Sequence, residues 1–207
     1  MPLHVARHGR LEDTVTDFTH DYLAQSAAAF TAFHSAAYHA QMQEMAGTIE
    51  RSFRAGGKLM LCGNGGSAGD AQHIAGEFLS RLMYDRPPLP ALALTTDTSV
   101  MTAIGNDYGY DKLFERQVLG LGRAGDVLIG ISTSGTSPNI VQALTAARSI
   151  GVVCLGFTGA RGGPMHELAS AVLAVPSTHT PIIQQLHITA AHIICALVER
   201  AMFPQMP

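Results

Sequence analysis

The chain has 207 residues, enough to bury one substantial hydrophobic core, and this length excludes a disulfide-stapled miniprotein. Hydrophobic residues make up 47% of the chain and charged residues only 14%, against roughly a quarter in an average soluble domain. Because so few charges would cover a monomer poorly, we expect an oligomer. The formal net charge of −3 offers no basic surface for a nucleic-acid backbone, which disfavours nucleic acid as a ligand.

Cysteine usage and the N-terminal segment indicate the compartment. The cysteines are few, far apart and set in apolar segments, which predicts buried thiols in a reducing environment: Cys62, Cys154 and Cys195. The first residues, MPLHVARHGRLEDT, lack the apolar run of a signal peptide, and no apolar stretch is expected to approach the ~20 residues of a membrane span. We therefore expect a soluble cytoplasmic protein with no membrane partner.

Residues 11–54 predict two N-terminal helices. This segment is rich in alanine, nearly free of glycine and proline, and carries apolar residues at helical spacing. The helices should break between residues 34 and 39. We expect them to form a helical hairpin that packs against another subunit.

Residues 56–203 predict an α/β core. Five short apolar runs alternate with helical patterns, and each run is closed by a turn rich in glycine or serine: KLMLCG, LPALALTTD, DVLIGISTS, VVCLGFTG and AVLAVPST. This alternation indicates a five-stranded parallel sheet sandwiched by helices, of the flavodoxin-like or Rossmann-like class. A final helix is predicted over 181–202 because it starts with proline and runs to PQMP. The whole chain, 1–207, is predicted to be a single domain.

The first glycine-rich loop, GNGGSA at 63–68, follows a predicted strand and precedes a helix that should begin near Gly69. Free N–H groups and the helix dipole at such a position attract anions of phosphate size. The loop also matches the GxGxxA dinucleotide fingerprint, but the next acidic residue at a strand end, Asp97, is far along the chain. A tight turn that simply needs glycine remains the alternative.

The second loop, STSGTSP at 132–138, again joins a strand to a helix and gathers several hydroxyl groups around one glycine. Neutral hydroxyl donors at a helix start can surround the oxygens of a phosphate monoester without lysine or arginine. Capping of the helix by Ser137 and ordinary turn chemistry would explain one or two of these hydroxyls. Two such loops favour a sugar phosphate over a dinucleotide.

Two helices carry residues that can bind a metal or move protons. His73 and Glu77 are one turn apart, so they can share a metal, act as an acid and base pair, or form a surface ion pair. On the last helix, Gln184 and His192 lie about 80° apart around the axis and ~12 Å apart along it. Both can face one pocket, although reaching a single metal would stretch them.

A further pair of polar residues precedes the second loop. Asn106 and Asp107 form a candidate turn, and their amide and carboxylate could also bind sugar hydroxyls.

Several segments together resemble the phosphoheptose isomerases of the SIS (sugar isomerase) fold: GNGGSAGDAQHIAGEF, LTTDTSVMTAIGNDYGYDKLFERQ, GDVLIGISTSGTSPNI, GFTGARGG and IIQQLHITAAHII. The resemblance implies a homotetramer with active sites at subunit interfaces. It implies conversion of sedoheptulose 7-phosphate into D-glycero-D-manno-heptose 7-phosphate, the first committed step toward the heptose of lipopolysaccharide and related glycans. Asp70 and Arg81 also match residues near the active site of that family.

The same resemblance implies the ligands of one zinc ion per subunit: His73, Glu77, Gln184 and His192. It also implies a set of substrate contacts: Asn64, Gly65, Gly66, Ser67, Glu77, Asn106, Asp107, Ser132, Thr133, Ser134, Ser137 and Gln184.

Interconversion of a ketose and an aldose moves a proton between C1 and C2 through an enediolate, which needs a base, an acid and stabilisation of oxyanion charge. Glu77 is the predicted base and His192 the predicted acid. Zinc could polarise the carbonyl or only order the site, and both roles use the same ligands.

Two other proteins of this fold remain as alternatives. A non-catalytic SIS adaptor that binds the bacterial replication initiator resembles the same segments, and an isomerase of hexose or pentose phosphates would share both loops. The presence of both Glu77 and His192 favours the enzyme over the adaptor.

Overall fold

The computed structural model describes the backbone of residues 9–204 and the side chains of residues 17–204. Its centre is one sheet of five parallel strands in the order β2-β1-β3-β4-β5. The strands are β1 (Leu59–Gly63), β2 (Ala91–Ala93), β3 (Val127–Ile131), β4 (Val153–Gly159) and β5 (Ala171–Val175). Every residue of β1 and β3 is buried, as expected for strands covered on both faces. The predicted five-stranded parallel sheet is therefore confirmed.

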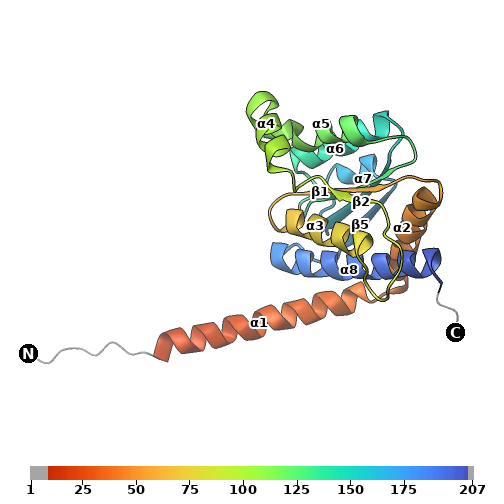
Figure 1. Cartoon of the computed structure of the whole chain (residues 1–207). Coiled ribbons are helices and arrows are strands. Elements are labelled where there is room, and N and C mark those ends of the chain that lie inside the picture. The colour runs from red at the N-terminus through yellow and green to blue at the C-terminus, as the bar shows by residue number, and fades with distance from the viewer. Residues whose placement is uncertain (1–8, 205–207) are drawn as a thin grey trace, which may run out of the picture.

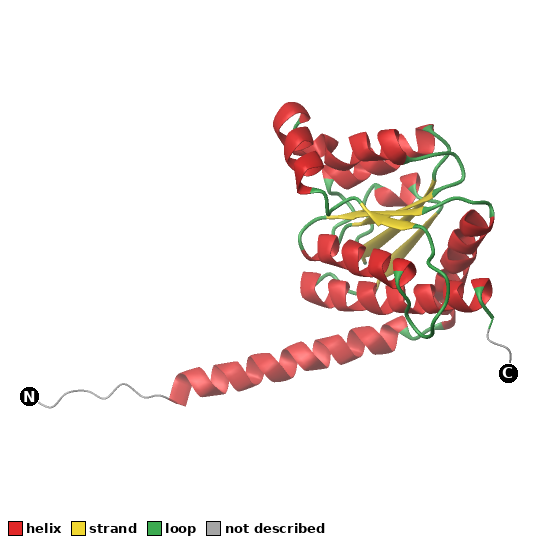
Figure 2. Ribbon diagram, viewed as in Figure 1, coloured by secondary structure: helices red, strands yellow, loops and turns green. Residues whose placement is uncertain are grey.

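Helices cover the two faces of the sheet and enclose two separate cores (Figures 1 and 2). One face carries α2 (Ala36–Arg54), α3 (Gly66–Leu79) and α8 (Thr180–Met202). The other carries α4 (Thr98–Tyr108), the 3-10 turn η1 (Tyr110–Lys112), α5 (Leu113–Leu121), α6 (Pro138–Ser149) and α7 (Met165–Leu168). All three cysteines are buried free thiols, as predicted.

The N-terminal helices are α1 (Gly9–Phe33) and α2, and the break between them falls at residues 34–35. The prediction of two helices with a break in this region is confirmed. They do not fold back on each other as a closed hairpin: α2 packs against α8, while α1 projects away from the domain (Figure 1). Phe18 and Leu23 on α1 are 66% and 62% exposed, so α1 presents apolar side chains beyond the core.

Helix α8 is long and apolar enough to cross a membrane by length and composition alone, which corrects the expectation that no stretch approaches that length. Half of its most apolar window is buried inside the domain. Leu186, Ala190 and Ile194 of this helix belong to the core it shares with α2 and α3. Its apolar composition thus matches its position against the sheet.

A buried carboxylate ties the starts of β1 and β3 together. Asp126 is 3% exposed and accepts hydrogen bonds from the backbone N–H groups of Lys58 at 2.9 Å and Arg123 at 2.8 Å, and it pairs with the Lys58 ammonium. Burial alone would raise the pKa of Asp126, but the hydrogen bonds from Lys58 and Arg123 outweigh it and hold the pKa below its usual value.

Replacing Asp126 with Asn should lower the free energy of unfolding at neutral pH by about 1–3 kcal/mol, because an N–H group or the ammonium loses its acceptor. Since the folded-state pKa is depressed, the stabilisation is present above the unfolded pKa and is lost as the pH falls through the folded pKa, below about pH 4. Denaturant unfolding between pH 3 and pH 7 measures both effects. The exposed control Asp85→Asn should match the wild type, and equal stability of the Asp126 variant at neutral pH would contradict this account.

Candidate active site

The strand order places a topological switch point at the carboxyl edge of the sheet, between β1 and β3. After β1 the chain passes into α3 on one face, and after β3 it passes into α6 on the other, so the order reverses between these neighbouring strands. Ligands of open α/β sheets bind at such a point. Asn64, after β1, and Asn139, in the first turn of α6, exchange two hydrogen bonds of 2.9 Å across it. The two predicted phosphate loops therefore lie side by side.

The first loop turns sharply into α3, which begins at Gly66, three residues earlier than predicted. Gly65 caps the helix with a φ of +56°, in the left-handed region that favours glycine. A Cβ atom on Gly66 would lie 2.5 Å from the amide nitrogen of Gln184 in α8. The bare backbone of Gly66 thus lets the Gln184 side chain lie against the start of α3.

The second loop forms a connected group of hydroxyls. The Ser132 Oγ lies 2.8 Å from that of Ser137 and 3.4 Å from that of Ser134, which lies 2.9 Å from the Thr136 hydroxyl. Ser137 occupies the N-cap position of α6, yet within the described chain its hydroxyl makes no capping bond. Capping therefore does not account for Ser137, and these rotatable hydroxyls can turn toward the oxygens of a ligand.

Glycines bring the loop after β4 against the second loop. Gly135 has a φ of +70°, and a Cβ atom there would lie 1.9 Å from the carbonyl oxygen of Gly162. A Cβ atom on Gly163 would likewise lie only 2.5 Å from the carbonyl oxygen of Gly135. The GFTGARGG segment consequently supports the hydroxyl loop by direct backbone contact.

Three predicted ligands converge between α3 and α8. The Nε2 atom of His73 lies 2.9 Å from Nε2 of His192 and 3.1 Å from Oε1 of Glu77. Two imidazole nitrogens that face each other need a proton or a metal between them. A tetrahedral zinc site with Zn–N bonds of 2.0–2.1 Å has edges of about 3.3 Å, close to the separations found here. The three side chains fit a divalent metal, and three protein ligands with an open position are typical of catalytic zinc.

The other predicted site residues lie elsewhere around this cluster. Gln184 lies beside Gly66, ~12 Å along the α8 axis from His192. Asn106 and Asp107 are exposed in the last turn of α4 and are joined by a hydrogen bond of 2.8 Å. The prediction of a turn at these two residues is wrong, since both are helical.

The sequence did not identify Asn139 and Tyr110 as residues that contact the first loop. Asn139 is 2% exposed, and the Tyr110 hydroxyl donates to the side-chain oxygen of Asn64 at 3.0 Å. An asparagine in the first turn of a helix is too common to signal this role.

Asp70, which the resemblance placed near the site, has one buried carboxylate oxygen without a hydrogen-bond partner among the described residues. Burial raises the pKa of Asp70, and nearby His73 opposes this.

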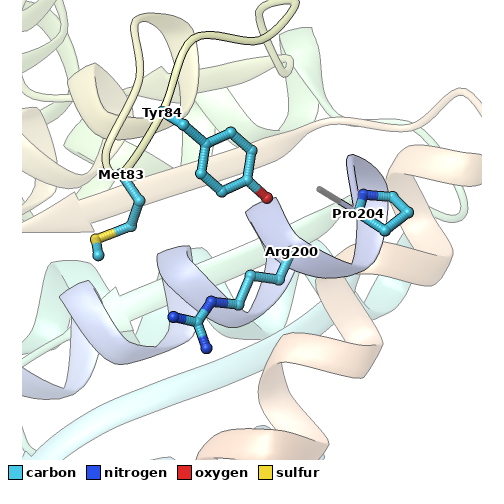
Figure 3. A pocket seen from close by; sticks show the side chains of 4 residues that line it. All are labelled: Met83, Tyr84, Arg200 and Pro204. Atoms are coloured by element: carbon cyan, nitrogen blue, oxygen red, sulfur yellow. The ribbon is translucent and has the colours of Figure 1, made fainter. Parts of the chain in front are cut away.

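A cavity of about 480 Å³ lies at the far end of α8. Met83 and Tyr84 from the segment after α3 lie over Arg200 and Pro204 (Figure 3). Arg200 is ~12 Å along the helix axis from His192. This cavity is therefore separate from the cluster of His73, Glu77 and His192.

The fold and the site define a SIS domain, and the model of the SIS domain family matches residues 21–159. A phosphoheptose isomerase from Burkholderia pseudomallei is 60% identical over 164 residues, which cover 79% of this chain and 83% of that protein. Another from Rhodospirillum rubrum is 56% identical over 159 residues, 77% of this chain and 85% of that protein. The chain belongs to the phosphoheptose isomerase family.

Solved structures agree with this assignment. The phosphoheptose isomerase from Neisseria gonorrhoeae superposes with a TM-score of 0.82 at 40% identity, covering 89% of this chain and 98% of that one. The phosphoheptose isomerase from Francisella tularensis superposes with a TM-score of 0.86 at 33% identity, covering 90% and 98%. The SIS fold implied by the resemblance is confirmed.

The convergence of ligands predicts that the purified protein binds zinc or cobalt. Changing His192 to Ala should weaken binding about 100-fold or more, because loss of a direct ligand should exceed the 10–100-fold effect of outer partners. Competition against a chromophoric chelator measures the affinity. His39→Ala, an exposed histidine on α2, should bind as the wild type does. Unchanged affinity of the His192 variant would remove the cluster as a metal site.

Proposed function

We propose that this protein converts sedoheptulose 7-phosphate into D-glycero-D-manno-heptose 7-phosphate, the first step of heptose precursor synthesis for lipopolysaccharide or related glycans. The observation that carries the proposal is the convergence of His73, Glu77 and His192 on α3 and α8. The two adjacent loops, and relatives named phosphoheptose isomerase, support the same activity. A cytoplasmic location agrees with a soluble metabolic enzyme and with buried free thiols.

The two loops bind the phosphate at C7. The hydroxyls of Ser132, Ser134 and Ser137 and the N-termini of α3 and α6 supply neutral donors and positive dipole ends. The phosphate is remote from C1 and C2, so its binding energy orients the open-chain sugar for the reaction. Asn64, Gly65, Gly66, Ser67 and Thr133 belong to the same two loops, and we assign them substrate contacts.

Glu77 and His192 move the protons. The Glu77 carboxylate removes a proton from C1 of the ketose and returns it to C2, while His192 donates a proton to the oxygen at C2 and takes up the proton that the C1 hydroxyl loses. The Glu77 side chain is only 17% exposed, which limits its solvation and keeps it directed at His73. Asn106 and Asp107 at the end of α4 are the proposed contacts to sugar hydroxyls.

A zinc ion held by His73, Glu77 and His192 would polarise the carbonyl or order these side chains. Gln184 is the fourth ligand implied by the family resemblance. Its amide against Gly66 more directly supports its other proposed role, a substrate contact beside the first loop.

We also propose that the protein is a homotetramer with active sites at subunit interfaces. The exposed apolar side chains of Phe18, Leu23 and Phe30 on α1 support this, because α1 projects from the domain and a second copy would cover it. In this arrangement 1–207 is a single SIS domain in which 11–54 serve subunit packing and 56–203 form the catalytic core.

Replacing Glu77 with Gln should leave the fold intact but lower kcat by at least about 100-fold, because the amide cannot accept the C1 proton. Formation of the aldoheptose phosphate from sedoheptulose 7-phosphate is followed by NMR, with zinc present. Glu44→Gln, an exposed glutamate on α2, is the matched control. Comparable turnover in the Glu77 variant would refute the assignment of Glu77 as the base. A folded wild-type protein that binds the sugar phosphate without turning it over would favour the alternative of a non-catalytic SIS adaptor.

Replacing Ser134 with Ala should mainly raise KM, by about fivefold to tenfold, because one neutral hydrogen bond to the phosphate contributes about 1–1.5 kcal/mol. Steady-state kinetics separate this effect from kcat. Ser149→Ala, at the far end of α6 where the hydroxyl donates to the Ala146 carbonyl, should leave both constants unchanged. An unchanged KM for the Ser134 variant would contradict the proposal that the second loop binds the phosphate of the substrate.

A further inference from the structure

Helices α3 and α8 run side by side in the same direction, since each follows a parallel strand and begins at the carboxyl edge of the sheet (Figure 1). Three contacts join them along their length. Gln184 meets Gly66 at their beginnings, and His192 meets His73 near the middle. The third contact, at the opposite end, is a buried ion pair that the proposed reaction does not use.

That pair joins Arg86, in the segment after α3, to Glu199 on α8. The Arg86 Nε lies 3.0 Å from Oε1 of Glu199, and the two side chains are 2% and 1% exposed. The carboxylate also accepts the backbone N–H groups of Leu82 at 3.2 Å and Met83 at 2.9 Å. Glu199 therefore fixes both the arginine and the backbone that leads away from α3.

The guanidinium reaches back to the end of α3. Its Nη2 donates to the backbone carbonyl of Glu77 at 2.7 Å, and its Nη1 donates to that of Phe78 at 2.6 Å. The last carbonyls of a helix lack partners within the helix, and a cation there also opposes the negative end of the dipole. Arg86 thus holds the backbone of the residue that carries the proposed base.

Glu199 is equally well placed on α8. It follows His192 by two turns, about 20° around the axis and ~10.5 Å along it, so both side chains face α3. Rotation or sliding of α8 against α3 would break the bonds of Glu199 and change the separation between His192 and His73. One buried pair thereby links the backbone at Glu77 to the helix that carries His192.

We infer that Arg86 and Glu199 are positioning residues, which set the separation of His73 and Glu77 on α3 from His192 on α8. Buried ion pairs often contribute little net stability, because desolvation offsets their attraction. The forked geometry of this pair, with three backbone carbonyls and one carboxylate on a single guanidinium, points to alignment instead. The inference rests on the proposed metal site and on Glu77 as the base.

Arg86→Lys tests it, because lysine keeps the charge but one ammonium cannot reproduce the planar fork. Metal affinity should fall about 10–100-fold, as for other outer partners of metal ligands, and the visible spectrum of the cobalt-substituted protein should change. We expect kcat to fall about tenfold or more, with KM within twofold of the wild type because both phosphate loops are untouched. Thermal unfolding confirms that the variant is folded.

Arg54→Lys is the matched control. Arg54 also pairs with a glutamate, Glu50, at 2.7 Å and donates to a carbonyl of α8, that of Ala201, at 2.7 Å, but it lies on α2. The Arg54→Lys substitution should leave the cobalt spectrum, the metal affinity and kcat unchanged. Should Arg86→Lys fail to fold, Glu199→Gln, which preserves shape, is measured by the same criteria.

A folded Arg86 or Glu199 variant with the cobalt spectrum, metal affinity and kcat of the wild type overturns the inference. A loss of stability accompanied by equal changes in kcat and KM assigns the pair a merely structural role and also overturns it. If the wild type itself neither binds cobalt nor turns over sedoheptulose 7-phosphate, the proposed function fails first and the inference falls with it.

Discussion

The parallel sheet is the constraint on which the rest of this protein depends. Because all five strands point the same way, their carboxyl ends and the helices that follow them meet at one edge. The order β2-β1-β3-β4-β5 then sends α3 and α6 to opposite faces, and the two loops that precede these helices meet at the switch point. Two helix N-termini and a group of hydroxyls gather there, so an anion can be held by neutral donors in a chain with little charge.

The second constraint is the contact between α3 and α8. These helices come from strands far apart in the sheet order, yet they pack on the same face and bring His73 next to His192. For the proposed metal site their alignment would matter to within a few tenths of an ångström, since a shared metal tolerates little displacement of its ligands. At one end of this contact, Gly66 has no side chain and lets Gln184 lie against the start of α3. At the other end, the buried ion pair of Arg86 and Glu199 holds the two helices together.

Two of the charged side chains buried in this domain, Asp126 and Arg86, align backbone segments. Asp126 gathers N–H groups at the start of two strands, and Arg86 gathers carbonyls at the end of a helix. In each case the charged group satisfies backbone atoms that secondary structure leaves without partners. Polar groups of the second loop, such as the hydroxyls of Ser132 and Ser137, instead bond to one another and remain free to exchange those bonds for a ligand.

The sequence by itself determined the alternation of strands and helices, the five-stranded parallel sheet, both loops and the i, i+4 pair His73 and Glu77, because these depend on local spacing. Even the start of α3 was predicted only to within three residues, because the helix begins at Gly66, directly after its cap Gly65, rather than near Gly69. Tertiary structure alone decided that α1 projects, that Asn139 pairs with Asn64, and that Arg86 reaches Glu199. These contacts join segments separated by 75 or more residues, and local pattern carries no information about such distances.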